Sequence, residues 1–189
     1  LDALLTTWLT AALACFIRAQ LAREDRVLNR RWMLGCWVFM ALAVLTKGLI
    51  GVLIPAVTLI LYSLLQRDHR MYDCLNLRWG LPAFTLIAAP WFVAAARQNP
   101  AFLEFFFIRE HIERYLTPIE QRMQPWWFFI AVLFVGILPW AWRAARALAQ
   151  DWQGRVPAGR FDVVRLLWVW SVFVLVFFSA SDSKLVPYV

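Results

Sequence analysis

Long apolar stretches alternate with shorter polar ones along the whole chain. Six apolar segments can be drawn, and they cover residues 3–17, 32–46, 48–65, 79–96, 126–142 and 166–180. Because open strands cannot satisfy their backbone hydrogen bonds in lipid, each segment is expected to be a helix. The pattern therefore predicts an all-α fold, a polytopic helical membrane protein with about six transmembrane helices.

The longest apolar run, Trp32 to Leu65, contains a single charged side chain, Lys47. As one straight helix its 34 residues would span about 51 Å, whereas the hydrocarbon core of a bilayer is about 30 Å thick. A lysine at bilayer depth costs about 3 kcal/mol, and Gly48 gives the chain freedom to turn. The run is predicted to be two spans joined at residues 46–48, with Lys47 at a membrane surface.

Composition agrees with this class. Hydrophobic residues make up 62% of the 189 residues, charged residues 16%, and the mean hydropathy is +0.62, values typical of an integral membrane protein. The three cysteines lack the spacing of metal ligands or a disulfide framework. Since the chain opens inside an apolar segment and ends without a terminal loop, we expect a fragment, with residues 1–189 all part of one transmembrane domain.

The net charge of +7 would suggest nucleic acid in a soluble chain, but here the arginines lie between apolar segments and no nucleic-acid partner is expected. Residues 18–31, 66–78 and 143–165 carry thirteen Lys or Arg, against six in the other connections and the tail. The positive-inside rule then places those three connections in the cytoplasm. Asp2, Lys47, the 97–125 connection and the tail are expected on the outer face.

The 97–125 connection has a pattern of its own. Between Ala101 and Leu116, aromatic and aliphatic residues alternate with charges at nearly helical spacing, and Arg109/Glu113 and Glu110/Arg114 are four apart. This predicts an outer interfacial helix that carries His111. A surface helix whose charges serve only for solvation remains open as the simpler interpretation.

Further polar residues could contact an anion. The chain changes abruptly after Phe178 to Ser179-Ala180-Ser181-Asp182-Ser183-Lys184, and hydroxyls with a lysine suit a phosphate. The simpler interpretation of the tail is a plain helix terminus. The simpler interpretation of Lys47 is a structural lysine whose side chain snorkels to the membrane surface. Asp2, Lys47, the His111 helix and Lys184 nevertheless all fall on one face. That convergence favours a site for an amphiphile with an anionic head, and no nucleotide-binding or metalloprotease motif is present.

Four motifs in this order resemble a known family. They are Leu1-Asp2 at the start of a span, Leu45-Thr46-Lys47-Gly48-Leu49 followed by Pro55, Phe107-Ile108-Arg109-Glu110-His111 with Arg114-Tyr115-Leu116, and Phe177-Phe178-Ser179 to Ser183-Lys184-Leu185. Together they resemble the bacterial lipid A aminoarabinose transferases, within the protein O-mannosyltransferase-like membrane glycosyltransferases. The tail departs from the family pattern because Val186 stands between Leu185 and Pro187.

The resemblance implies a glycosyltransferase domain in the bacterial inner membrane with its active site facing the periplasm. The donor would be a polyprenyl-phosphate sugar, the acceptor lipid A or another periplasmic glycan, lipid or protein, and transfer would invert the anomeric carbon. Asp2 and His111 would be catalytic, with the principal catalytic aspartate upstream of Leu1. The substrate-binding residues would be Lys47, Arg109, Arg114, Lys184 and Tyr188.

No metal site or other cofactor is predicted, although the family leaves room for a divalent cation held through His111. The lysines, with the arginines beside His111, are expected to neutralise the phosphate that leaves as the acceptor hydroxyl attacks. A lipid or sugar transporter or flippase is the alternative function. Carriers tend to place charges near the midplane and to show paired repeats, whereas here the charges gather at one surface. An O-antigen-type ligase or polymerase and a purely structural membrane subunit also remain open.

Overall fold

The structure is a computed structural model, and it describes residues 1–99, 102, 125, 127–143, 145–146, 157 and 159–180. In these residues the regular elements are α1 (Asp2–Leu21), α2 (Arg26–Lys47), α3 (Ile50–Gln66), η1 (His69–Met71), η2 (Asp73–Leu75), α4 (Leu77–Gln98), α7 (Phe128–Ile137), η4 (Leu138–Trp140) and α9 (Val163–Ala180). Each of the six predicted apolar segments forms a helix. The predicted all-α membrane fold is therefore confirmed.

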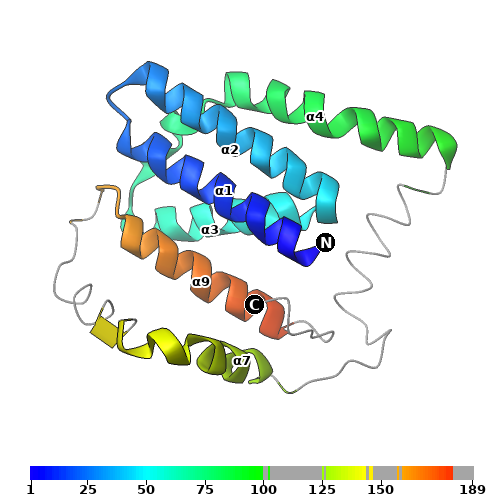
Figure 1. The fold of residues 1–189 in the computed structure, drawn as a ribbon. Helices are drawn as coiled ribbons and strands as arrows, with labels where there is room; N and C mark the ends of the chain where they lie inside the picture. The colour runs from blue at the N-terminus through cyan, green and yellow to red at the C-terminus, as the bar shows by residue number, and fades with distance from the viewer. Residues whose placement is uncertain are drawn as a thin grey trace.

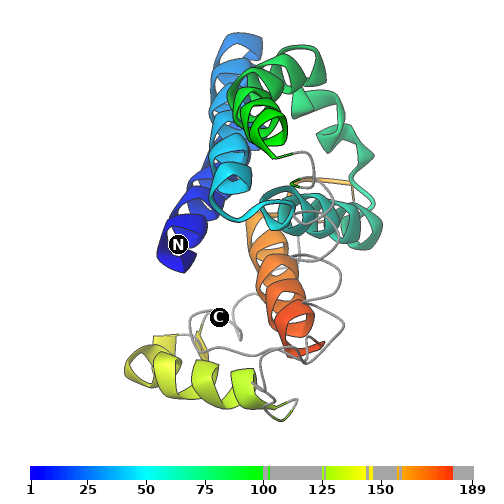
Figure 2. The same cartoon turned by 90° about the vertical axis from the view of Figure 1, so that its right-hand side faces the viewer.

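Four helices, α1, α2, α4 and α9, are long and apolar enough to cross a membrane, and two shorter apolar helices cover Ile50–Gln66 and Phe128–Arg143. Figure 1 shows the helices lying roughly side by side, with α4 beside α2, α1 and α3 in the middle, and α9 between them and α7. The contacts agree, since α1 packs along α2, α2 against α4, α3 against α9, and α9 against α7. The turned view in Figure 2 shows α7 set apart from the α1–α4 group, with α9 between them.

The turn predicted at Lys47 is present. Helix α2 ends at Lys47, Gly48 follows with φ of +76°, and α3 begins at Ile50. A positive φ strains residues with a Cβ, so glycine suits this position. Gly51 then packs so closely on α2 that a Cβ there would lie 2.7 Å from the carbonyl carbon of Ala43. The two spans therefore fold back on each other immediately after the turn.

Prolines have different effects in two of the helices. Pro82 and Pro90 lie inside α4, which continues from Leu77 to Gln98. Pro139, in contrast, falls in the short η4 element, where the helix begun by α7 tightens into a 3₁₀ turn. This is the local change expected where a proline removes a backbone donor.

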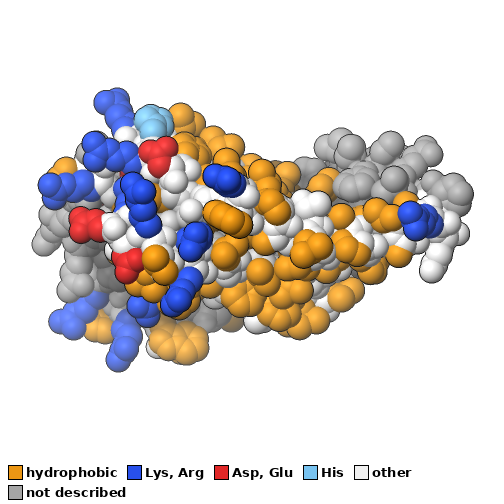
Figure 3. Space-filling view, turned by 90° about the horizontal axis from the view of Figure 1, so that it is seen from above, with side chains coloured by type: hydrophobic (Ala, Val, Ile, Leu, Met, Phe, Trp, Pro, Cys, Tyr) orange, Lys and Arg blue, Asp and Glu red, His pale blue; other side chains and the backbone are white. Residues whose placement is uncertain are grey.

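Basic side chains gather at one end of the molecule (Figure 3). This end holds the connection between α1 and α2, the segment of η1 and η2 between α3 and α4, and the start of α9. The 46–48 turn, the start of α1 and the end of α9 lie at the opposite end (Figure 1). Within the described residues, the predicted alternation of connections between two faces is confirmed.

A group of hydrogen bonds, here called the α3–α9 clasp, joins α3 to the start of α9. It consists of Tyr62, Gln66, Arg160, Asp162 and Arg165. The buried Gln66 amide donates to the carbonyl oxygens of Pro157, at 3.1 Å, and Arg160, at 2.8 Å, and its oxygen accepts from Arg165 Nη1. The Tyr62 hydroxyl accepts from the Asp162 backbone N–H at 2.8 Å. The clasp anchors the start of α9 to the end of α3. It therefore helps to set the position and direction of α9.

Candidate functional site

Two of the predicted site residues meet in the structure. Asp2 is the first residue of α1, Lys47 is the last of α2, and because these helices run antiparallel both lie at the same end. Lys47 Nζ donates to Asp2 Oδ1 in an ion pair, with each side chain 31% exposed. The backbone carbonyl of Asp2 also accepts from the Thr6 hydroxyl at 3.0 Å. The ion pair is therefore reachable from outside and held by two helices.

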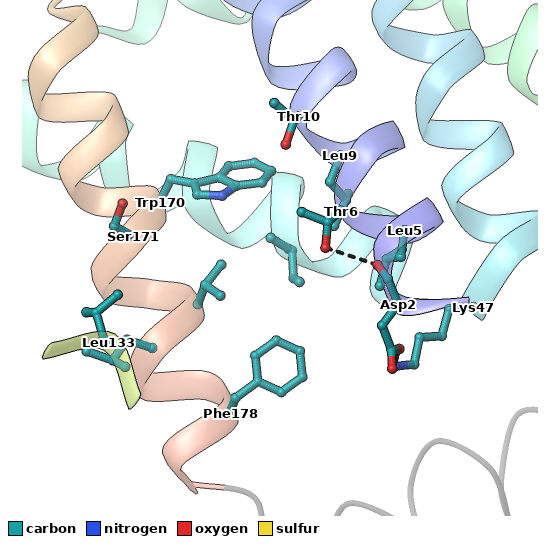
Figure 4. Close-up of a pocket in the computed structure, with 13 residues that line it drawn as sticks. Asp2, Leu5, Thr6, Leu9, Thr10, Lys47, Leu133, Trp170, Ser171 and Phe178 are labelled. Carbon is teal, nitrogen blue, oxygen red and sulfur yellow. Dashed lines mark hydrogen bonds and ion pairs between the residues drawn. The ribbon is translucent and has the colours of Figure 1, made fainter. Parts of the chain in front are cut away.

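The ion pair lies at the edge of a pocket of about 320 Å³ (Figure 4). Most of its lining comes from α1 and α9, with single residues of α2, α3 and α7 completing it. The apolar lining residues are Leu5, Leu9, Ile54, Leu133, Trp170, Val174, Leu175 and Phe178. Three hydroxyl residues, Thr6, Thr10 and Ser171, complete the wall. A charged edge with a largely apolar wall suits an amphiphile with an anionic head.

The pocket depends on the position of α9. Figure 4 shows Trp170 and Phe178 of α9 facing Leu9 and Thr6 of α1 across the pocket. Phe178 also belongs to the buried cluster that contains Leu5, Leu9 and Ile54. The α3–α9 clasp at the other end of the helix sets the path of α9, so polar contacts far from the pocket support its wall.

The other predicted site residues are not placed. Arg109, His111, Arg114, Lys184 and Tyr188 lie outside the described residues, as does the predicted interfacial helix apart from Phe102. Among the described residues no group of three His, Cys, Asp or Glu side chains could hold a metal ion. Since His111 is not among them, the expectation about a divalent cation stays a prediction.

Sequence reasoning missed the hydroxyl residues of the pocket. Thr6 and Thr10 follow Asp2 at intervals of four, which places the three on one face of a helix. That spacing inside an apolar segment was the available signal. Trp170 and Ser171 carried no comparable signal, because only the tertiary fold brings α9 opposite α1.

Fold and site together define a class of protein: a polytopic helical membrane protein with a largely apolar pocket, charged at its edge, at the end away from its basic connections. A family model described as dolichyl-phosphate-mannose-protein mannosyltransferase matches residues 1–106, more than half of the chain. The chain belongs to this family. The matched range includes Asp2 and Lys47, so the ion pair lies within the family's part of the fold.

Curated relatives match the entire chain. It is 34% identical over 197 residues to "undecaprenyl phosphate-alpha-4-amino-4-deoxy-L-arabinose arabinosyl transferase 1" of Sodalis glossinidius and 32% identical over 193 residues to the enzyme of that name without the numeral from Edwardsiella ictaluri. In both comparisons 100% of this chain matches 33% of the relative. The chain thus spans about a third of the length of these relatives.

Two solved structures share the fold. Both are crystal structures of ArnT from Cupriavidus metallidurans, 33% identical to this chain and matching 99% of it. The structure bound to undecaprenyl phosphate has a TM-score of 0.89 over 33% of its length, and the apo structure has 0.81 over 32%. The helices of this chain therefore have the arrangement of about one third of ArnT.

Proposed function

We propose that the protein is a glycosyltransferase that moves a sugar from a polyprenyl-phosphate donor to lipid A, with inversion at the anomeric carbon. The single observation that carries the proposal is the Asp2–Lys47 ion pair at the edge of a largely apolar pocket. The ammonium group suits a lipid phosphate, and the apolar wall suits the first part of a polyprenyl chain. The pocket's 320 Å³ accommodates a headgroup and the start of the chain rather than the whole lipid.

The chemistry is a single displacement. The acceptor hydroxyl oxygen forms a bond to the anomeric carbon as the bond from that carbon to the phosphate oxygen breaks, and the hydroxyl proton passes to a general base. Negative charge grows on the departing phosphate in the transition state, so a fixed cation accelerates the step. Lys47 supplies that cation, and Asp2 orients its ammonium group. Arg109, Arg114, Lys184, Tyr188 and His111 are proposed to complete the site as predicted from the sequence.

The comparisons support this proposal in two ways. The curated relatives are named as transferases that use undecaprenyl phosphate-linked aminoarabinose, so they favour transfer over the alternative of a transporter. One of the two ArnT structures that share the fold is bound to undecaprenyl phosphate, which supports a polyprenyl-phosphate donor.

The orientation is part of the proposal. The basic end shown in Figure 3 would face the cytoplasm of a bacterium, and the pocket end would face the periplasm from the inner membrane. Polyprenyl-phosphate sugar and lipid A would then meet at the outer leaflet. The reacting groups would then lie at the same membrane surface as the ion pair.

The test is a transfer assay with the whole protein in proteoliposomes that contain undecaprenyl phosphate-linked aminoarabinose and lipid A. Mass spectrometry should detect lipid A heavier by one aminoarabinose residue and an equal amount of free undecaprenyl phosphate. Lys47→Met should lose most of this product. Donor that crosses the bilayer without modified lipid A would overturn the proposal in favour of transport.

A further inference from the structure

Two arginines from different helices approach one exposed tryptophan at the basic end. The guanidinium carbon of Arg30, in α2, lies 5.8 Å from the Trp79 ring centroid, and that of Arg78, beside it in α4, lies 6.0 Å away. Trp79 is 52% exposed, and both arginines are exposed. Cation–π attraction to the ring favours each guanidinium at this distance. The ring therefore holds two positive charges at one surface position.

These charges are not neutralised within the described part of the chain. The ion pairs there are Arg23–Asp68 and Lys47–Asp2, and neither includes Arg30 or Arg78. The first turn of α4 has no acidic residue, and the Asp25 carboxylate accepts hydrogen bonds at the N-terminus of α2. Both guanidinium groups thus lie beside one exposed ring, and neither forms an ion pair with a carboxylate in this part of the chain, so an external anion would be attracted there.

The start of α4, which carries Arg78 and Trp79, is held in place by its neighbours. Trp37 fills the space beside Gly80 so completely that a Cβ on Gly80 would lie 2.0 Å from the indole nitrogen, and that nitrogen donates to the Leu75 carbonyl at 2.9 Å. The Asn76 amide also donates to Asn29 Oδ1 at 2.6 Å. These contacts hold the start of α4 against the first half of α2. The packing of the two helices thus places Arg30 and Arg78 beside the same tryptophan ring.

This site is suited to the membrane interface. Tryptophan is enriched where headgroups meet acyl chains, and a second arginine–tryptophan pair, Arg18 with Trp32 at 6.0 Å, lies at the same end. On the same face of α4 as Trp79, Leu86 and Val93 follow at intervals of seven residues and are 77% and 48% exposed. An acyl chain can follow these side chains while its headgroup stays beside the arginines.

We propose that Arg30, Arg78 and Trp79 form a binding site for the phosphate of an anionic phospholipid headgroup, here called the Arg30–Arg78 site. Guanidinium groups bind phosphate through paired charge-assisted hydrogen bonds, and the exposed apolar residues of α4 accept the lipid tail. The occupant is a lipid of the surrounding leaflet. This inference is independent of the proposed transfer reaction, whose pocket lies at the opposite end.

The test measures lipid bound to the purified whole protein by native mass spectrometry in detergent, with dioleoyl phosphatidylglycerol added in increasing amounts. Dioleoyl phosphatidylcholine and inorganic phosphate serve as separate comparison ligands. The variants are Arg30→Gln, Arg78→Gln and the double substitution. Arg31→Gln is the matched control, because it removes the same charge from the next position of α2 and Arg31 is also exposed.

Each single substitution should weaken the binding of phosphatidylglycerol about fivefold and the double substitution more than tenfold, as expected for about one interfacial arginine contact each. Arg31→Gln should change it by less than twofold, and phosphatidylcholine should bind weakly to every form. The proposal would be overturned if the double variant lost no more affinity for phosphatidylglycerol than Arg31→Gln does. Equal binding of the two lipids, or displacement of phosphatidylglycerol by millimolar inorganic phosphate, would also overturn it.

Discussion

Lys47 at the end of α2 forms an ion pair with Asp2 at the start of α1, although the two are 45 positions apart in the sequence. The antiparallel packing of the two helices brings these ends together. The same pairing explains how a lysine is accommodated in the longest apolar run of the chain. It lies at a helix end, partly exposed, beside a carboxylate.

The first prediction separates a structural ion pair from a phosphate contact. Lys47→Met should lower kcat/KM for sugar transfer by about a hundredfold or more, the effect typical of losing a fixed charge that stabilises the transition state. The charge exchange Asp2→Lys with Lys47→Asp keeps an ion pair between the same helix ends but moves the cation to α1. It should leave activity as low as Lys47→Met does. The transfer assay compares both variants with the parent protein.

Folding supplies the control for this experiment. Both partners are about a third exposed, so the pair contributes at most about 1 kcal/mol to stability. Expression and the SDS concentration that unfolds the protein should therefore change little in every variant. Near-normal activity of the charge-exchanged protein would assign the pair a structural role alone.

The sequence predicted the fold well because membrane helices follow local rules. Apolar length, a single turn at Gly48 and the distribution of arginines sufficed to predict the helices and their alternating direction. The site was predictable only in part. Asp2 and Lys47 stood out as charged residues at the ends of apolar segments. The lining of the pocket, in contrast, depends on how α9 packs opposite α1. The residue pattern within one segment does not show which other helix that segment will face.

The α3–α9 clasp illustrates the same limit. Gln66 is the last residue of α3 and reads in the sequence as an ordinary polar helix end. In the structure it is fully buried and bonded to residues more than ninety positions away. Polar residues at the end of a span can be solvent-exposed or can join two helices, and only the packing distinguishes these outcomes.

The second prediction uses Cys74 as a natural reporter of orientation. Cys74 lies in the connection between α3 and α4 and is half-buried, whereas Cys15 and Cys36 are buried within α1 and α2. A membrane-impermeant maleimide should label Cys74 in inverted inner-membrane vesicles and leave it unlabelled in spheroplasts. The Arg97→Cys variant, made in a Cys74→Ser background, should show the opposite pattern, because Arg97 lies in the last turn of α4. Labelling of Cys74 in intact spheroplasts would reverse the proposed orientation.

The third prediction concerns the pH dependence of that labelling. Burial raises the pKa of the Cys74 thiol above its ordinary value, and the positive charge of Arg23 opposes this only in part. The thiolate is the reactive form, so a raised pKa means less thiolate at neutral pH. Labelling in vesicles should be slower than that of a fully exposed cysteine at pH 7 and should keep accelerating beyond pH 9. A rate that levels off below pH 8.5 would contradict a raised pKa.

The fourth prediction tests the close contact that follows the Lys47 turn. In Gly51→Ala the new methyl group would lie 2.7 Å from both the Ala43 carbonyl carbon and the Val44 nitrogen, which are backbone atoms that cannot rotate away. Overpacking of this kind costs about 1–3 kcal/mol. The protein should therefore unfold at a lower SDS fraction in mixed micelles. Gly136→Ala is the matched control, since a Cβ there meets nothing within 4 Å among the described residues, and it should be neutral or mildly stabilising.

The fifth prediction tests whether the α3–α9 clasp holds the pocket wall. Gln66→Leu would leave two backbone carbonyls and the Arg165 guanidinium without the partner that Gln66 provides, at a cost of about 1–3 kcal/mol for each group left unsatisfied. Amide hydrogen exchange should rise in the first two turns of α9, which begins at Val163. Gln98→Leu, an equal substitution at the exposed end of α4, should leave exchange in α9 unchanged. If Gln66→Leu unfolded at the same SDS fraction as the parent and left the α9 amides equally protected, the clasp could not be what positions α9 opposite α1.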